Sequence, residues 1–397
     1  MSVFLETGGA LAYVEAHFER SIGAAGRFFE QHAGAVAEVC RLMAGRFEAG
    51  GSLYVLGEGA QASDAHHAAV EFVHPVLVGK RALTAVALGS DAAFVAALAD
   101  PGDIALAICA GVPSTAIDRA MGAARERGLL TVVLSGGAGR ASGGACFAVA
   151  EDDPCVVQEV HETLYHVLWE LVHLFLGDED ELQGYLAPAG RSDEDRLVQA
   201  RESTRQKCRD VCALRAEVRV SSASGIAEAS RAIASRLARG GRLLAFGNGG
   251  SATDAEDAAI DCMAPPTAGW RAVPALALTA DAGIITAVGN DVGFDHVFAR
   301  QVAAYGRPAD VALGFSTSGT SRSVLNGLRE AGARGLLTVA LAGYDGGAMA
   351  APGAVDYCFV APSDYVPRIQ EAHATIWHAL LGAAQSELRL TPPGSRP

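Results

Sequence analysis

The chain contains two copies of one pattern, and this internal repeat constrains its fold more than any other feature. The segment Ser63–Glu71 matches Thr253–Asp261, which lies 190 positions later. Two further matched pairs have offsets of 207 and 212 positions: Arg127–Leu134 with Arg334–Leu341, and Gln158–His161 with Gln370–His373. Two long copies indicate a duplicated domain, because a solenoid needs several short repeats.

The repeat divides the 397 residues into two expected domains, 1–190 and 191–397. The connection between the copies is 177–195, where the acidic run Asp178–Glu181 is followed by proline, glycine and serine. Such a composition is typical of an exposed linker. We therefore place the domain boundary near residue 190.

The composition excludes several functional classes. Hydrophobic residues make up 50% of the chain, which is too many for global disorder. The net charge of −14 argues against a nucleic acid or an anionic membrane as partner, because both attract basic surfaces. No stretch reaches the roughly 20 apolar residues of a membrane helix. Eight scattered cysteines without a Cys-x-x-Cys pair favour reduced thiols and a cytoplasmic location.

Short apolar runs alternate with helical patterns in both copies. In the first copy a helix with apolar residues from Val36 to Phe47 ends at Gly50-Gly51, before an expected strand Leu53–Leu56. Five strands are expected in the second copy: Leu243–Phe246, Ala275–Leu278, Val311–Phe315, Leu337–Leu341 and Tyr357–Val360. This alternation predicts an α/β fold with parallel sheets covered by helices on both faces. Ligands of such folds bind at the carboxyl ends of the strands.

Two loops of the second copy occupy that position, each after an expected strand and before a helix. They are Gly247–Ser251 and Ser316–Ser321. Hydroxyls and free backbone N–H groups at a helix N-terminus suit a phosphate dianion, and glycine allows its close approach. Either loop alone could be an ordinary helix cap. Two such loops in one domain favour a phosphate site.

On these residues, the second copy resembles the SIS (sugar isomerase) domain of the sedoheptulose-7-phosphate isomerase, or phosphoheptose isomerase, family. The matching motifs are Gly247–Ser251, Gly289–Phe294, Ser316–Ser321 and Arg368–Glu371, followed by His378. The first copy resembles the same family more faintly. The resemblance implies two tandem SIS domains, each a flavodoxin-like or Rossmann-like three-layer sandwich. It also implies that the phosphate is bound by loop residues of the second copy: Asn248, Gly249, Ser251, Ser316, Thr317, Ser318 and Ser321.

The family also carries His-x-x-x-Glu on the helix after the first loop and Gln-x7-His on the last helix. These four side chains hold zinc in some members, and the Glu and the final His are the acid–base pair. The first copy has the full set, which is His67, Glu71, Gln158 and His166. By resemblance, Glu71 and His166 are therefore candidate catalytic residues and all four are candidate zinc ligands. The loops of this copy have lost most of their hydroxyls.

The second copy has intact loops but an altered acid–base set. Asp257 and Asp261 replace the His and the Glu, while Gln370 and His378 remain. Asp261 and His378 are thus the alternative catalytic pair, and these four residues are the alternative metal set. Along one helix, the two aspartates lie roughly 9 and 15 Å from Ser251.

Two arrangements of the site stay open. Our hypothesis is that the phosphate loops of the second copy work with the His/Glu/Gln/His set of the first, and the rival is a self-contained site in the second copy. His67 and His166 taken singly would be ordinary buried or surface histidines. The aromatic residues Tyr165, Trp169 and Trp377 are interpreted as packing residues.

The resemblance implies an aldose–ketose isomerase that converts sedoheptulose 7-phosphate to D-glycero-D-manno-heptose 7-phosphate through an enediol. Zinc is the candidate cofactor, and no nucleotide cofactor is expected because isomerisation is redox neutral. The expected partner is a small sugar phosphate. The alternatives are another sugar-phosphate isomerase and a non-catalytic SIS protein, such as a regulator of the DnaA-associating type. Since the family is typically tetrameric, a homodimer that mimics four SIS domains is expected.

Overall fold

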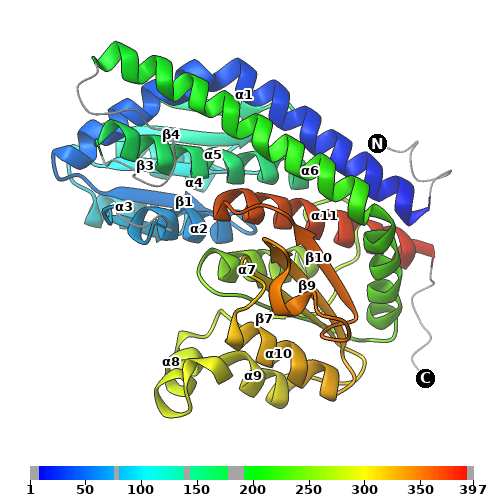
Figure 1. The fold of residues 1–397 in the computed structure, drawn as a ribbon. Helices are drawn as coiled ribbons and strands as arrows, with labels where there is room; N and C mark the ends of the chain where they lie inside the picture. The colour runs from blue at the N-terminus through cyan, green and yellow to red at the C-terminus, as the bar shows by residue number, and fades with distance from the viewer. Residues whose placement is uncertain (1–8, 76–79, 138–143, 178–191, 391–397) are drawn as a thin grey trace. The chain divides into compact units, whose positions relative to one another are not determined.

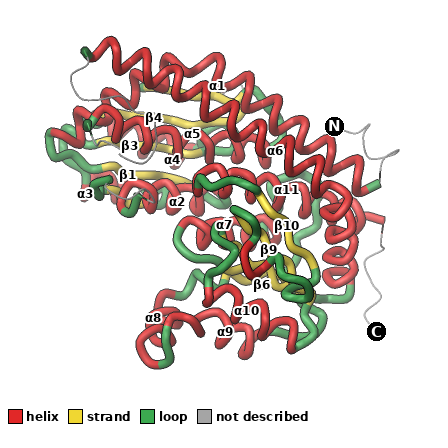
Figure 2. Tube along the Cα trace, viewed as in Figure 1, coloured by secondary structure: helices red, strands yellow, loops and turns green. Residues whose placement is uncertain are grey.

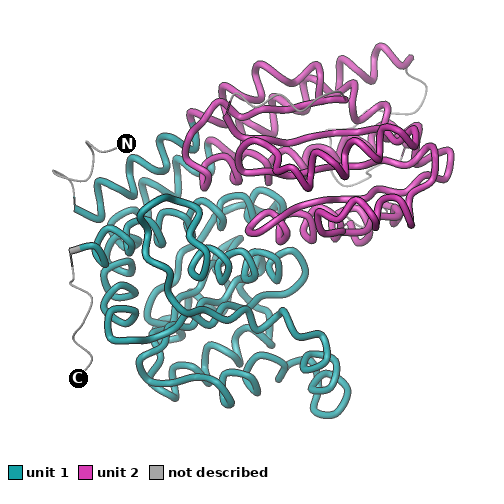
Figure 3. The backbone as a smooth tube through the Cα atoms, turned by 180° about the vertical axis from the view of Figure 1, so that it is seen from behind, with its two compact units in different colours: residues 1–22, 213–397 teal, residues 23–212 magenta. Residues whose placement is uncertain are grey.

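The chain folds into two compact units (Figure 3). Unit 1 comprises residues 1–22 and 213–397, with the second copy of the repeat, and unit 2 comprises residues 23–212, with the first copy. The computed structural model describes residues 9–75, 80–137, 144–177 and 192–390. The boundary expected near residue 190 therefore lies outside the described residues. Asp193–Asp195, expected in the linker, instead begin helix α6.

Unit 2 is built on a sheet of five parallel strands in the order β2-β1-β3-β4-β5 (Figure 1). The strands are β1 (Leu53–Gly57), β2 (Ala85–Leu88), β3 (Ile104–Ile108), β4 (Leu130–Gly136) and β5 (Ala145–Val149). The helices within the unit are α2 (Gln61–Val73), α3 (Ala92–Leu98), α4 (Thr115–Glu126) and α5 (Pro154–Phe175). Two long helices, α1 (Ala10–Glu48) and α6 (Asp193–Ala238), each contribute one part to unit 2 and the other part to unit 1.

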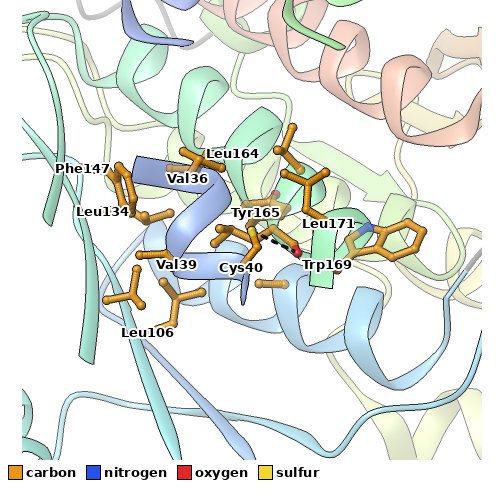
Figure 4. Close-up of a cluster of buried hydrophobic side chains, with 14 of the residues drawn as sticks. Val36, Val39, Cys40, Leu106, Leu134, Phe147, Leu164, Tyr165, Trp169 and Leu171 are labelled. Atoms are coloured by element: carbon orange, nitrogen blue, oxygen red, sulfur yellow. Dashed lines mark hydrogen bonds between the residues drawn. The ribbon is translucent and has the colours of Figure 1, made fainter. Parts of the chain in front are cut away.

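Each face of this sheet has its own core, because alternate residues of a strand point to opposite faces. Leu53 and Val55 of β1 pack in one cluster with α1, α2 and α5, whereas Tyr54 and Leu56 pack in another with α3 and α4. Figure 4 shows part of the first cluster, where Cys40 of α1 lies near Tyr165 of α5. The unit is therefore a three-layer sandwich.

Unit 1 repeats this plan with the strand order β10-β9-β8-β6-β7, again entirely parallel. Its strands are β6 (Leu243–Phe246), β7 (Ala275–Ala277), β8 (Val311–Ser316), β9 (Leu337–Gly343) and β10 (Tyr357–Ala361). Its helices, drawn red in Figure 2, are α7 (Gly250–Met263), α8 (Ala282–Asp291), α9 (Val297–Tyr305), α10 (Arg322–Ala333) and α11 (Val366–Leu390), with short 3₁₀ turns at Phe294–His296 and Gly347–Met349. Read from its β7 edge, this order matches that of unit 2 strand for strand. The two copies of the repeat therefore share one sheet topology.

The start of α1 completes one core of unit 1. Val14 and Phe18 are fully buried there in the same cluster as Trp377 of α11 and residues of α6 and α7. Helices α1 and α11 approach each other closely, since a Cβ atom at Gly382 of α11 would lie 2.1 Å from the hydroxyl of Tyr13 of α1. Residues at the beginning of the chain thus pack against its last helix.

The α/β fold class predicted from the sequence is confirmed for both units. All five strands expected in the second copy are present, with ends that differ by at most two residues. The helix expected to end at Gly50-Gly51 is α1, which is longer than the pattern indicated. None of the eight cysteines, all of which are among the described residues, forms a disulfide bond. Among the described helices, none combines the length and apolar character needed to cross a membrane.

Candidate active site

The two glycine- and serine-rich loops of unit 1 lie next to each other. They follow β6 and β8, which are neighbouring parallel strands, so both loops emerge at the same edge of the sheet. The first loop turns sharply, and a Cβ atom at Gly247 would lie 2.2 Å from the carbonyl oxygen of Ser251. Gly249 has φ +60° and caps α7, which places Ser251 in the first turn of that helix. The sequence therefore needs glycine at both positions to form this turn.

A side-chain network joins the two loops. The amide of Asn248 donates to the hydroxyl of Ser321 at 2.7 Å and to that of Ser323 at 2.9 Å. In the second loop, the hydroxyls of Ser316 and Ser318 lie 3.5 Å apart. Ser251 and Ser316 are buried, Thr317 and Ser321 are partly exposed, and Ser318 is exposed. The candidate phosphate residues thus form one cluster of hydroxyls at the N-termini of α7 and α10.

The candidate acid–base residues of unit 1 also come together. Nε2 of His378 lies 3.6 Å from Oδ2 of Asp261 and 3.9 Å from Oδ2 of Asp257. Donor atoms of these three side chains all lie within 4.8 Å of one another, and the three residues are buried. Gln370 is buried on the same helix as His378. Helices α7 and α11 therefore present two carboxylates and an imidazole to each other.

Two aromatic residues complete this cluster. The indole Nε1 of Trp377 donates to Oδ2 of Asp261 at 3.1 Å. The other carboxylate oxygen, Oδ1, is buried and has no hydrogen-bond partner among the described residues. His17 of α1 is also buried, and its ring centroid lies 6.2 Å from that of His378. Asp261 is thus oriented through one oxygen, while its second oxygen remains available to a ligand.

The four candidates of the first copy occupy corresponding helices of unit 2. His67 and Glu71 are on α2, where Nε2 of His67 lies 3.6 Å from Oε1 of Glu71. Nδ1 of His67 lies 3.1 Å from the hydroxyl of Tyr165. His166 and Gln158 are buried on α5. A third acidic residue, Glu162, joins His67 and His166 in a group whose donor atoms lie within 4.8 Å of one another.

The loops of unit 2 keep the backbone of a phosphate site with few of its hydroxyls. Gly57 and Gly59 correspond to Gly247 and Gly249, and Gly59 has φ +61°. However, Gln61 stands at the position of Ser251, and Glu58 adds a negative charge. Cys109 replaces Ser316, and burial raises the pKa of its thiol to about 12, with further contributions from nearby acidic groups including Glu58. The described loops of unit 2 therefore have few of the groups that would attract a phosphate.

Each unit has a further buried histidine with a lowered pKa, His161 on α5 and His373 on α11. Burial lowers the pKa of His161 to about 4, opposed by the hydrogen bond between its Nε2 and the Ser135 carbonyl at 3.3 Å. Burial likewise lowers the pKa of His373 to about 4. Both imidazoles are therefore neutral at pH 7 and stay outside the acid–base clusters described above.

Sequence reasoning missed four residues of these clusters. Tyr165 and Trp377 are buried as expected of packing residues, but each also contacts a candidate site residue through its polar atom. Glu162 could have been found from its position one helical turn before His166. His17 lies far away in the sequence, and nothing in its local pattern indicates that it packs beside His378.

Comparison with known proteins gives consistent matches for the second copy. A family model described as SIS domain matches residues 208–343. The phosphoheptose isomerase of Solidesulfovibrio magneticus is 46% identical over 171 residues, which cover 43% of this chain and 82% of that protein. The phosphoheptose isomerase of Aquifex aeolicus is 44% identical over 158 residues, which cover 40% of this chain and 82% of that protein.

Solved structures match almost the whole chain at low identity. A putative tagatose-6-phosphate ketose/aldose isomerase from Clostridium novyi has a TM-score of 0.64 at 11% identity, covering 95% of this chain and 89% of that chain. The C-terminal domain of glucosamine-fructose-6-phosphate aminotransferase from Francisella tularensis has a TM-score of 0.61 at 9% identity, covering 98% of each chain. These two matches show the fold alone.

Proposed function

The chain belongs to the phosphoheptose isomerase family and is an isomerase, and we propose that it converts sedoheptulose 7-phosphate to D-glycero-D-manno-heptose 7-phosphate. Unit 1 supports this proposal, because its hydroxyl-rich loops and its acid–base cluster belong to the same copy of the repeat. The observation that carries the proposal is the position of Asp261. Its Oδ2 lies 3.6 Å from Nε2 of His378, and its buried Oδ1 has no hydrogen-bond partner among the described residues.

The phosphate group of the substrate binds at the paired loops. Ser251, Ser316, Thr317, Ser318 and Ser321 supply hydroxyls, and the N-termini of α7 and α10 supply backbone N–H groups. Asn248 holds the two loops together through Ser321 and Ser323. This binding needs no lysine or arginine, which agrees with an acidic protein that binds an anionic sugar.

Asp261 acts as the general base. Its Oδ2 is held by the indole of Trp377, so Oδ1 is the oxygen that takes the proton from the carbon beside the substrate carbonyl. His378, 3.6 Å away, transfers a proton between the two substrate oxygens as the enediol forms and collapses. Because both side chains are buried, the sugar reaches them only when the groups that cover them move.

Zinc is the candidate cofactor of unit 1. Carboxylate oxygens and imidazole nitrogens are donors that zinc accepts, and Asp257, Asp261 and His378 offer three of them within 4.8 Å. Gln370 is the fourth ligand that the family resemblance implies. The close approach of Oδ2 of Asp257 and Nε2 of His378, at 3.9 Å, fits this role and leaves Oδ1 of Asp261 to the proton transfer. When bound, zinc supplies a Lewis acid that polarises the carbonyl.

We also propose that the chain forms a homodimer, in which four SIS units take the place of the four subunits of a single-domain relative. Light scattering tests this directly. The expected mass is about twice the 40.8 kDa of one chain, and a mass equal to that of one chain would contradict the proposal.

Incubation with sedoheptulose 7-phosphate tests the proposed activity. We expect an aldoheptose 7-phosphate to appear in the reaction mixture, with and without added zinc compared in parallel. If no conversion occurs in either case, the proposed reaction is wrong. Binding of the sugar phosphate without conversion would instead indicate a sugar-phosphate-binding protein. Conversion of another ketose phosphate would keep the isomerase reaction and change only the assigned substrate.

A further inference from the structure

A row of aromatic rings leads from α1 to the proposed catalytic histidine of unit 1. His17 is 3% exposed, and its ring centroid lies 6.2 Å from that of His378, with the two ring planes at 73°. The ring of Tyr13, one helical turn earlier on α1, is stacked with that of His17 at an interplanar angle of 10° and a centroid distance of 6.2 Å. Both distances lie within the range of roughly 4.5–7 Å in which stacked and edge-to-face aromatic pairs attract each other. The three rings therefore connect the start of the chain with the acid–base cluster.

This row depends on a glycine of α11. A Cβ atom at Gly382 would lie 2.1 Å from the hydroxyl oxygen of Tyr13 and 2.3 Å from its ring carbon Cζ. Position 382 therefore takes only glycine while Tyr13 keeps this place. Gly382 stands four residues after His378, and residues four apart share one face of a helix. The face of α11 that carries His378 is thus shaped to receive α1.

The corresponding helices of unit 2 pack without an aromatic row. At the three positions that correspond by the offsets of the repeat, unit 2 has other residues, namely Ser203 for Tyr13, Lys207 for His17 and Glu170 for Gly382. The ammonium group of Lys207 forms an ion pair with Glu170 and donates to the hydroxyl of Ser203 at 3.0 Å. The two helices can therefore be joined by an ion pair, so packing alone does not account for the rings beside His378.

His378 needs a fixed ring position for its proposed work. An imidazole turns about two side-chain torsions, so its neighbours decide where its nitrogen atoms point. The proposed proton transfer depends on the place of Nε2, which lies 3.6 Å from Oδ2 of Asp261. The edge-to-face contact with His17 restricts this rotation, as the hydrogen bond from Trp377 restricts the carboxylate of Asp261.

We propose that Tyr13 and His17 are positioning residues that hold the ring of His378 in place for proton transfer. The inference rests on the proposed function, because that function assigns His378 its role. His17 acts through the contact of its ring and not through a proton of its own. Both residues precede the sheet of the first copy in the chain, yet they belong to unit 1. The start of the chain thereby completes the site of the second copy.

Kinetics and crystal structures of full-length variants test the proposal. His17→Phe keeps a ring beside His378, whereas His17→Gln keeps a polar side chain without a ring. Val14→Ala is the matched control, because Val14 is fully buried on α1 one turn before His17, and its truncation weakens packing without removing a ring. The assay measures kcat and KM with sedoheptulose 7-phosphate. The crystal structures give the distance from Nε2 of His378 to Oδ2 of Asp261.

We expect His17→Gln to lower kcat about 10- to 100-fold while KM stays nearly constant, because a small displacement of a catalytic group has this effect. Its crystal structure should show the ring of His378 displaced or in two positions. His17→Phe and Val14→Ala should keep the kcat and the ring position of the parent. The proposal is wrong if the His378 ring keeps its single position in His17→Gln, if kcat does not fall there, or if either of the other variants loses as much kcat.

Failure of the proposed function would be recognised separately. If the parent does not convert the sugar phosphate, that function is wrong, and the crystal structures alone decide whether His17 positions His378. If His17→Gln does not fold, Tyr13→Ser, which introduces the residue of the second copy at a partly exposed position, is subject to the same criteria.

Discussion

The indole nitrogen of Trp377 donates a hydrogen bond to Oδ2 of Asp261, at 3.1 Å. In the first copy, the residue that corresponds to Trp377 is Tyr165, and its hydroxyl contacts His67. The same helix position therefore contacts Asp261 of α7 in unit 1 and His67 of α2 in unit 2. This difference leads to the first two predictions.

Replacing Asp261 with asparagine should abolish most of the turnover. Asparagine keeps the shape and can still accept from Trp377, but it is not a base, and general base catalysis contributes about 10²- to 10⁴-fold. The measurement is kcat for the conversion of sedoheptulose 7-phosphate. Glu71→Gln is the matched control and should retain kcat. The reverse pattern would assign the acid–base chemistry to the first copy.

Trp377→Phe should lower kcat while KM stays nearly constant. Phenylalanine keeps most of the buried ring but cannot donate to Asp261, so the carboxylate loses its fixed orientation. Misplacement of a catalytic group by a small distance lowers kcat by about 10- to 100-fold. Tyr165→Phe removes the corresponding contact in unit 2 and should leave kcat unchanged. A parallel rise of KM in Trp377→Phe would indicate a general disturbance of the site instead.

Removal of a loop hydroxyl should weaken substrate binding. In Ser251→Ala and Ser316→Ala, we expect KM to rise roughly 10- to 100-fold, since a hydrogen bond to a charged group contributes about 1.5–3 kcal/mol. Ser114 of unit 2 is the control, because its hydroxyl caps α4 by accepting from the backbone N–H of Ile117. Ser114→Ala should lower stability by about 1 kcal/mol without changing KM. An unchanged KM in both loop variants would exclude these serines from phosphate binding.

Acid should destabilise the chain through two of its buried histidines, His161 and His373, because burial lowers the pKa of both. The pKa of His161 and of His373 is about 4 in the folded chain and near 6.5 in the unfolded chain. As the pH falls below 6.5, the unfolded chain takes up protons first, so stability present above pH 6.5 is lost towards pH 4. Each histidine accounts for a loss on the order of 3 kcal/mol.

Urea unfolding between pH 7 and pH 4 measures this effect. His373→Gln should show a shallower fall of the unfolding free energy than the parent, because glutamine does not titrate. His296→Gln, which changes an exposed histidine, should fall as steeply as the parent. Equal slopes for the parent and His373→Gln would show that His373 does not contribute.

The sequence predicts best those features that depend on residues close together in the chain. The strands could be predicted because buried parallel strands are short continuous apolar runs, as in Leu243–Phe246. The turn at Gly247 could be predicted because only glycine fits its backbone. Both features depend on neighbours within a few residues, and each of them occurs in both copies of the repeat.

The rest depended on contacts between distant segments. Trp377 was interpreted as a packing residue because nothing in its own helix shows that its indole nitrogen faces Asp261. Glu162 was overlooked because the family pattern drew attention to Gln158. That residues 10–22 of α1 pack in one core with α11 could not be predicted, since amphipathic helices do not specify which sheet they cover.

The packing of the first residues of the chain has a consequence for its synthesis. Residues 23–212 form one compact unit, so this unit can complete its core when residue 212 has been made, while translation continues. Val14 and Phe18, by contrast, pack in unit 1 against Trp377 and other residues that are made after unit 2. These two apolar side chains are therefore synthesised before unit 2 and buried after it. The nascent chain must keep this segment from aggregating while the residues of both units are made.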